Sequence, residues 1–236
     1  MNISVSSYSS TGNRENNEDS ILLVEKKDRI IAIAADGLGG YDCGEIASEI
    51  AVKTIEREIS CDELSEVHIE NAIQSANRAI LQRQTNTLKM KTTVSVLYIG
   101  DKSAVAASVG DTRIYQFRNN MISFQSVDHS VSQMAVFAGE ISASEIRTHR
   151  GRNKLVRVLG SQNEVKADVQ KLECRKGDSF LVCSDGFWEY VLESEMIEDL
   201  AGSYDANEWL AKMQKRVETR IRPNGDNHSA IVILIK

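Results

Sequence analysis

The chain has 236 residues, a formal net charge of −6, an isoelectric point near 5.4 and an apolar fraction of 42 %. This length suits one large domain or two small ones, and the acidic balance disfavours nucleic acid, whose phosphates need a basic face. The N-terminal residues predict no signal peptide, and no apolar run approaches the roughly 20 residues of a membrane span. The four cysteines lack metal-ligand spacing, so we expect reduced thiols and a cytoplasmic location.

The first part of the chain predicts a strand hairpin followed by two helices. Strands are expected at 20–25 and 29–35, joined by a turn at KKD. Apolar residues then recur every three to five positions from Glu45 to Ile59 and from Val67 to Leu81. This spacing predicts two amphipathic helices that pack on a sheet.

Further hairpins and two C-terminal helices are expected after residue 90. The predicted strands are 93–99, 104–109, 113–117, 179–184 and 230–235. Short helices at 130–139 and 142–146 fall in an irregular insertion between about 128 and 160. Helices at Glu193–Ala201, introduced by Ser194 or its neighbours, and at Ala206–Arg220 complete the pattern. This order predicts an α+β fold with antiparallel sheets covered by helices, and it is wrong for a doubly wound parallel sheet.

Acidic residues stand beside a glycine or an amide where apolar runs begin or end. They are Asp36, Asp111, Asp185 and Asp226, preceded by the pair Glu18 and Asp19. Carboxylates at the rim of an apolar core cannot all stay ionised unaided, because isolated buried charge is costly. A hard divalent cation would neutralise them together, and oxygen ligands favour magnesium or manganese over zinc. The sequence therefore predicts a metal hydrolase, with Asp36, Asp185 and Asp226 meeting at one sheet edge.

Two neighbouring residues support a phosphate-handling metal site. Gly37 would let its backbone carbonyl approach a cation, and Arg14 would clamp two phosphate oxygens, although alone it is more typical of a surface salt bridge. The segment GLGGYDCGE matches neither nucleotide-binding fingerprint, so it is expected to form a turn that aims Asp36. His129 and His149 are equally compatible with structural and catalytic roles.

The chain resembles the metal-dependent protein serine/threonine phosphatases of type 2C, in their compact bacterial form. The matching segments are GNRENNEDS (12–20), ADGLGGYDCGEIAS (35–48), MKTT (90–93), SVGDTRIY (108–115), VDHSVSQ (127–133), GEI (139–141), RNKLVRVLG (152–160), KGDSFLVCSDGFW (176–188) and GDNHSAIVI (225–233). The resemblance implies one catalytic domain over residues 1–236. It also implies a β-sandwich of two antiparallel sheets flanked by helices, in four αββα layers, with a two-metal centre at one end.

The resemblance implies a set of metal ligands. Asp36 would bridge two manganese or magnesium ions, and the Gly37 carbonyl would bind one of them. Asp185 and Asp226 would hold the other ion. The pair Glu18–Asp19 would bind directly or orient metal-bound waters, while Asp111 and Asp185 would share a weaker third metal.

The same resemblance implies the reaction and its partners. Phosphoserine and phosphothreonine in proteins would be hydrolysed by direct attack of a metal-bridging water, with Arg14, Asp36 and Asp185 as the catalytic residues. Arg14 would grip the substrate phosphate, and residues 130–150 would form a flap that tunes access. Animal relatives carry histidine where this chain has Leu38, so a metal-bound water is the expected general acid. The implied partners are phosphoprotein substrates and a cognate bacterial serine/threonine kinase, with no nucleic acid and no membrane.

Three departures from the family pattern remove no metal ligand. Thr112 and Ser229 keep a hydroxyl, whereas Lys91 adds a cation where glycine is usual. A pseudophosphatase, the same fold used as a binding module, is the first alternative, but its signature would be the loss of ligands that are all present. A partner-switching phosphatase would lack the arginine and the flap. A phosphodiesterase or nucleotidase is disfavoured because no nucleotide-binding signature is present.

Overall fold

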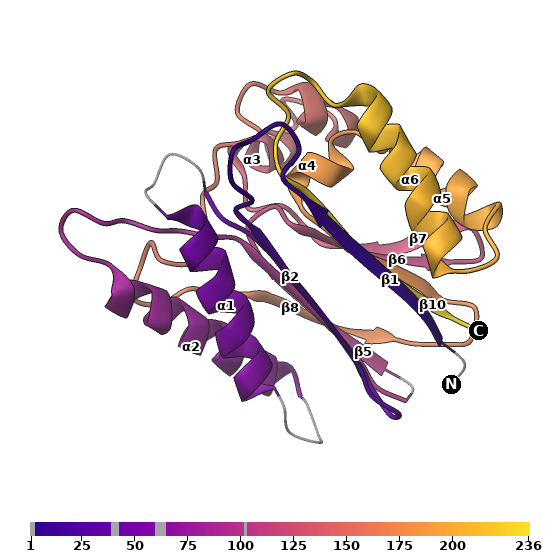
Figure 1. Ribbon diagram of the computed structural model, residues 1–236, viewed down its shortest axis with the longest axis horizontal. Coiled ribbons are helices and arrows are strands. Elements are labelled where there is room, and N and C mark those ends of the chain that lie inside the picture. Colours follow the sequence, from indigo (N-terminus) through magenta and orange to yellow (C-terminus); the bar gives the residue numbers. More distant parts are fainter. Residues whose placement is uncertain (1–2, 39–42, 60–64, 102) are drawn as a thin grey trace.

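Two five-stranded antiparallel sheets pack face to face, with helices on their outer sides (Figure 1). The structure is a computed structural model, and it describes residues 3–38, 43–59, 65–101 and 103–236. The first sheet has the order β1 (Ile3–Ser10), β10 (His228–Ile235), β9 (Ser179–Cys183), β6 (Arg113–Arg118) and β7 (Met121–Gln125). The second has the order β2 (Asp19–Glu25), β3 (Ile30–Asp36), β4 (Val94–Ile99), β5 (Ser103–Val109) and β8 (Asp168–Glu173). The expected α+β sandwich of antiparallel sheets is confirmed.

Strand β3 shows why the central strands are apolar on both faces. Successive side chains of a strand point to opposite faces of the sheet. Ile30, Ala32 and Ala34 accordingly pack into the core between the two sheets, whereas Ile31 and Ile33 pack toward the outer helices. The run IIAIAA is therefore buried throughout, and the site-bearing end of β3 is anchored by two hydrophobic clusters.

Helices cover the outer face of each sheet, and two short helices lie in the insertion. The second sheet carries α1 (Gly44–Glu58) and α2 (Glu66–Arg83), and the first carries α4 (Asp185–Trp188), α5 (Glu193–Ala201) and α6 (Ala206–Arg220). The insertion holds α3 (Val131–Phe137) and the short 3₁₀ helix η1 (Ala143–Thr148). Every predicted helix is present within a few residues of its predicted bounds, and α5 has the predicted bounds with Leu192 as its N-cap and Ser194 inside the helix. Within the described residues, no helix is both long and apolar enough to cross a bilayer.

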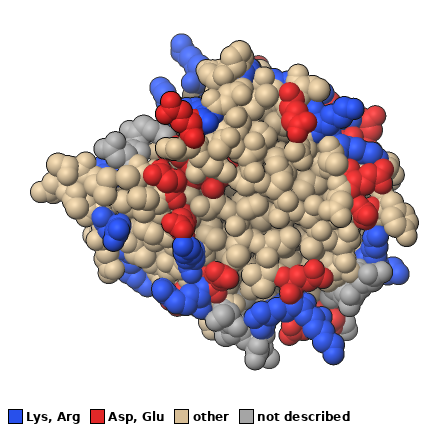
Figure 2. Space-filling model, in the orientation of Figure 1, with Lys and Arg blue, Asp and Glu red and all other residues tan. Residues whose placement is uncertain are grey.

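The sequence missed three strands, β1, β7 and β8, all of which lie at sheet edges. An edge strand tolerates polar residues because only part of it is buried, and β1 reads ISVSSYSS while β8 reads DVQKLE. β1 and β2 are the edge strands of the two sheets on the same side of the sandwich. Figure 2 shows that charged side chains are sparse over the centre of the face that these strands occupy in the view of Figure 1. Charges gather around its rim instead.

We expect Glu195→Gln to destabilise the contact between α5 and α6 at neutral pH. Arg220 and Arg216 both pair with this carboxylate, and these bonds lower the pKa of Glu195 to about 2. Because the pKa in the folded state lies below its ordinary value of 4.5, the stabilisation is present above that value and disappears as the pH falls toward 2.

Thermal unfolding followed by circular dichroism tests the predicted destabilisation of Glu195→Gln. The melting temperature of Glu195→Gln should be about 2–4 °C below that of the wild type at pH 7, with the gap narrowing as the pH falls below 4.5 and closing only near pH 2. Glu198→Gln is the control, because the Glu198 side chain is 73 % exposed and makes a single contact with Arg216. A gap that stays constant with pH would contradict the assignment.

Candidate active site

The predicted site residues meet at one end of the sandwich. A cavity of about 180 Å³ lies there, and its wall is formed by Arg14, Glu18, Asp36, Gly37, Leu38, Asp111, Asn153, Leu155, Asp185 and Asp226. Asp19 is buried directly beside it. The structure thus brings together every carboxylate that the sequence singled out, with Arg14 as the one cationic side chain among the described residues of the wall.

The prediction that Asp36, Asp185 and Asp226 share one sheet edge is wrong. Asp36 ends β3 in the second sheet, where it pairs with Asp19 at the start of β2. Asp185 follows β9 and Asp226 precedes β10, and both of these strands belong to the first sheet. The strands of stacked sheets run nearly aligned, so the ends of both sheets open on the same rim. The cavity therefore lies between the sheets.

Two threonines fix the backbone of Asp36. The Asp36 N–H donates to Thr93 Oγ1 at 3.0 Å, and the Asp36 carbonyl accepts from Thr93 N at 2.9 Å and from Thr92 Oγ1 at 2.8 Å. Thr93 Oγ1 also contacts Thr112 Oγ1 at 2.5 Å. The hydroxyl kept at position 112 therefore helps to hold the end of β3. Lys91 does not line the cavity, and its backbone carbonyl accepts the Leu38 N–H at 3.0 Å.

Asn227 and Ser184 are site residues that the sequence did not single out. Asn227 Oδ1 accepts the backbone N–H of Glu18 at 2.8 Å, and its Nδ2 donates to the carbonyls of Thr11 and Asn16 at 2.9 Å. Ser184 Oγ donates to Asp19 Oδ2 at 2.7 Å. The amide in the motif GDNHS was the available signal, because a buried side chain with both donors and an acceptor can tie two distant loops together.

The carboxylates of the site raise one another's pKa. Burial, followed by the charge of Asp185, raises the pKa of Asp36 well above its ordinary value, and the same two causes act on Asp111. Burial and then Glu189 raise the pKa of Asp185 to about 7, and burial raises that of Asp19 to about 6. The site thus gathers more negative charge than its own cations neutralise.

The donor set fits hard divalent cations. Its side-chain donors are carboxylate oxygens, and Asp19 Oδ1 is buried with no hydrogen-bond partner among the described residues. A Cβ at Gly37 would come within 2.8 Å of the Glu18 carbonyl, so only glycine lets these backbones approach. Among the described residues, no three histidine, cysteine or acidic side chains already converge closely enough to hold a metal. The residues of the cavity therefore fit divalent cations in their ligand chemistry, their negative charge and their common location.

A buried cationic network supports Asp111. The Trp188 indole N–H donates to the Asp111 carbonyl at 2.9 Å. The Arg113 guanidinium stacks 3.6 Å from the centre of the Trp188 ring and bonds both carboxylate oxygens of Asp128 at 2.7–2.8 Å. Arg147 of the insertion lies 5.4 Å from the same ring. The insertion and the floor of the site are thus in contact through one indole.

The two histidines of the insertion have structural positions. His129 Nδ1 accepts the Gly110 N–H at 2.9 Å, and its Nε2 lies 3.1 Å from Asp168 Oδ2. His149 Nδ1 accepts the Gly151 N–H at 3.1 Å. Neither ring lines the cavity. The predicted turn that would aim Asp36 includes residues 39–42, which lie outside the described residues.

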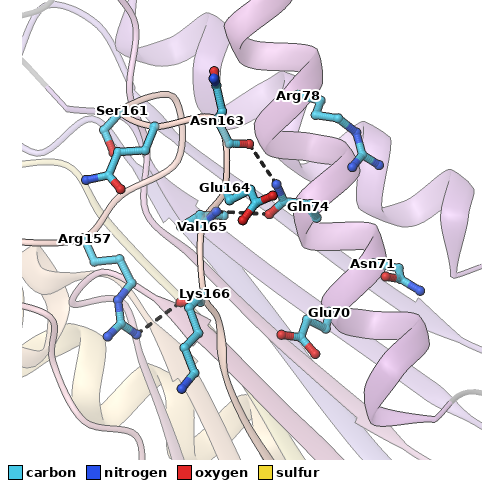
Figure 3. Close-up of a pocket in the computed structure, with 11 residues that line it drawn as sticks. Glu70, Asn71, Gln74, Arg78, Arg157, Ser161, Asn163, Glu164, Val165 and Lys166 are labelled. Carbon is cyan, nitrogen blue, oxygen red and sulfur yellow. Dashed lines mark hydrogen bonds between the residues drawn. The ribbon is translucent and has the colours of Figure 1, made fainter.

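A separate cavity is larger than the carboxylate cavity. It measures about 810 Å³ and lies between α2 and the segment that leads to β8 (Figure 3). The Gln74 amide braces that segment by bonding the Asn163 carbonyl and the Val165 N–H. This cavity shares no residue with the carboxylate cavity, so size alone does not identify the site.

Comparison with known proteins gives consistent matches. The family model described as "Protein phosphatase 2C" matches residues 8–227. The serine/threonine phosphatase stp of Listeria monocytogenes serotype 4b (strain F2365) is 32 % identical over 198 residues, which are 79 % of this chain and 78 % of that protein.

Two solved structures share the fold. The serine/threonine phosphatase Stp1 from Staphylococcus aureus has a TM-score of 0.88 at 26 % identity, covering 100 % of this chain and 96 % of that one. The catalytic domain of the phosphatase PstP, described in complex with two manganese ions, has a TM-score of 0.84 at 24 % identity and covers 98 % and 97 %. The arrangement of two sheets and outer helices therefore recurs across nearly the whole of both structures.

Proposed function

This chain belongs to the protein phosphatase 2C family, and on that premise we propose that it hydrolyses phosphoserine and phosphothreonine in proteins at the cavity between the two sheets. The observation that carries the proposal is that Arg14 and the carboxylates of both sheets line one cavity. A guanidinium beside oxygen ligands for divalent cations is the arrangement that phosphate-ester hydrolysis needs.

The proposal includes the cations of this metal-dependent family. Two ions, manganese or magnesium, would be held by Asp36, the Gly37 carbonyl, Asp185 and Asp226, with the pair Glu18–Asp19 as direct ligands or as partners of bound water. A weaker third would use Asp111 with Asp185. When bound, such cations activate water and polarise phosphate oxygens. Residues 1–236 would form one catalytic domain.

The side chains of the wall supply binding and orientation. Arg14 Nη2 lies 3.1 Å from Asp226 Oδ2, and the Arg14 side chain is 52 % exposed, so its guanidinium can reach a phosphate that enters the cavity. Leu38 and Leu155 add apolar wall that limits solvent around the ester. No histidine lines the cavity among the described residues. The proton for the leaving alkoxide would then come from solvent within the site, as the resemblance implies.

The partners follow from the substrate class. Phosphoserine and phosphothreonine in proteins are made by serine/threonine kinases, so we extend the proposal to a kinase that acts on the same proteins in the cytoplasm. The excess of acidic residues in the chain agrees with a protein partner and not with nucleic acid.

The proposal is tested by comparing substrates at one manganese concentration, with an EDTA blank for each. A phosphothreonine peptide should be hydrolysed with a kcat/KM at least about tenfold above that of the matched phosphotyrosine peptide and of a phosphodiester. Arg14 and the cations that the carboxylates would hold attract a dianionic phosphate ester, and a diester offers one negative charge fewer. Equal or faster hydrolysis of the diester would overturn the proposal in favour of a phosphodiesterase.

A further inference from the structure

A second cavity adjoins the candidate active site. It measures about 120 Å³ and shares four wall residues with the first cavity: Arg14, Asn153, Asp185 and Asp226. Two more arginines, Arg152 from the insertion and Arg222 from the turn after α6, also line it, together with Gly186, Glu189, Tyr190, Asn224 and Gly225. Three guanidinium groups therefore stand beside the place where a phosphate would be cleaved.

Two of the three arginines already form ion pairs with carboxylates of the wall. Arg14 pairs with Asp226 at 3.1 Å, and Arg152 pairs with Glu189 at 2.5 Å. Arg222 is exposed, and its guanidinium makes no hydrogen bond or ion pair with any described residue. The remaining wall carboxylate, Asp185, belongs to the proposed cation site. Arg222 is thus the group of this wall that is available to an incoming anion.

Hydrogen bonds join the turn that carries Arg222 to the loop that carries Arg14. Asn13 Nδ2 donates to the Arg222 carbonyl at 2.7 Å, and the Asn13 N–H donates to the Gly225 carbonyl at 3.2 Å. Within the turn, the Gly225 N–H donates to the Arg222 carbonyl at 2.8 Å. A preorganised pair of loops holds the two arginines together although they are far apart in sequence, and this lowers the entropic cost of binding an anion between them.

We propose that this arginine-lined cavity binds a second anionic group of the substrate, a carboxylate or a second phosphate near the phosphorylated side chain. The planar guanidinium of Arg222 forms paired hydrogen bonds with such groups. The substrate class would then be phosphoproteins whose phosphothreonine or phosphoserine has an acidic or phosphorylated neighbour. This inference rests on the proposed function, because it places the first phosphate at Arg14.

The experiment measures kcat/KM for a family of phosphothreonine peptides. The parent carries glutamine around the phosphothreonine, and each variant carries one glutamate or one phosphoserine up to three residues away on either side. The enzymes are the wild type, Arg222→Gln and Arg222→Glu. Arg78→Glu is the matched control, because Arg78 is exposed, bonds only Ser75 Oγ and lines the separate cavity of Figure 3.

We expect the wild type to favour the best acidic peptide over the parent by about fivefold or more. Arg222→Glu should lower kcat/KM for that peptide at least about fivefold more than for the parent, with Arg222→Gln between. Arg78→Glu should keep the preference, although its net charge changes equally. The glutamate and phosphoserine arms show which anion is preferred.

Two results would overturn the inference: a wild-type preference within twofold at every position, or equal losses on acidic and neutral peptides in Arg222→Glu. Failure of the proposed function looks different, since the wild type would then hydrolyse no peptide, the neutral parent included. In that case, fluorescence anisotropy with a phosphonate analogue of each peptide decides. An acidic preference in binding that Arg222→Glu removes supports the cavity, and its absence rejects it.

Discussion

Asp36→Asn is expected to lower kcat on a phosphothreonine peptide by at least about 10³-fold while the protein stays folded. The side chain lies between the two sheets, and its charge is opposed by Asp185, Asp19 and Asp111. Asparagine has the same shape but no charge, so it would be a poor cation ligand. The backbone bonds from Thr92 and Thr93 do not involve this side chain and should hold the end of β3 in place.

The same variant separates loss of a cation site from loss of the fold. In EDTA its melting temperature should equal or exceed that of the wild type, because one of several repelling charges is gone. Added manganese should raise the melting temperature of the wild type and raise that of the variant less, since ligands that bind the native state stabilise it. Asp101→Asn, in the exposed turn after β4, is the control and should behave as the wild type. A clearly lower melting temperature in EDTA would instead mean a structural role.

Gly37→Ala is expected to destabilise the protein by about 3 kcal/mol or more and to remove activity with it. A Cβ at this position would lie 2.2 Å from the Gly44 carbonyl oxygen and 2.8 Å from that of Glu18. Both obstacles are backbone, so relief requires α1 or the start of β2 to move. The Gly37 N–H also donates to the Glu18 carbonyl at 3.0 Å, and that bond would be strained.

Gly100→Ala is the matched control for this substitution. A Cβ at Gly100 meets nothing closer than 3.5 Å, which is ordinary van der Waals contact. Urea unfolding should place its free energy of unfolding within about 0.5 kcal/mol of the wild type. A Gly37→Ala protein as stable as Gly100→Ala would show that the approach of α1 to the end of β3 is looser than the structure has it.

The elements that sequence reasoning placed best are those with a repeating apolar pattern. The bounds of α5 and α6 were predicted to the residue, and the strand that became β3 was displaced by one position. Buried strands and amphipathic helices can be recognised in the sequence because one or both of their faces must be apolar. The edge strands β1, β7 and β8 are only partly buried, so they need no continuous apolar pattern. Their polar and charged residues therefore gave no signal of a strand in the sequence.

The site was predictable in its residues but not in its construction. Carboxylates beside glycine at strand ends pointed to Asp36, Asp185 and Asp226, yet nothing local tells which sheet a strand joins. That depends on pairings such as β1 with β10, across more than two hundred residues. The support of Asp111 by Trp188 and Arg113 was out of reach for the same reason, since it exists only once distant segments have packed.

The pairing of β1 with β10 has a consequence for how the protein is made. Ile3 lies opposite Ile235, and Asn227 ties the loops that carry Arg14 and Glu18 to the start of β10. The first sheet therefore cannot be completed, and the cavity cannot form, until β10 has left the ribosome. Closing so long a loop is slow, because its entropy is lost before the contacts repay it. A nascent chain stopped before β10 would contain Arg14 and Asp36 but no complete cavity, so we expect phosphatase activity only after β10 has been synthesised and paired with β1.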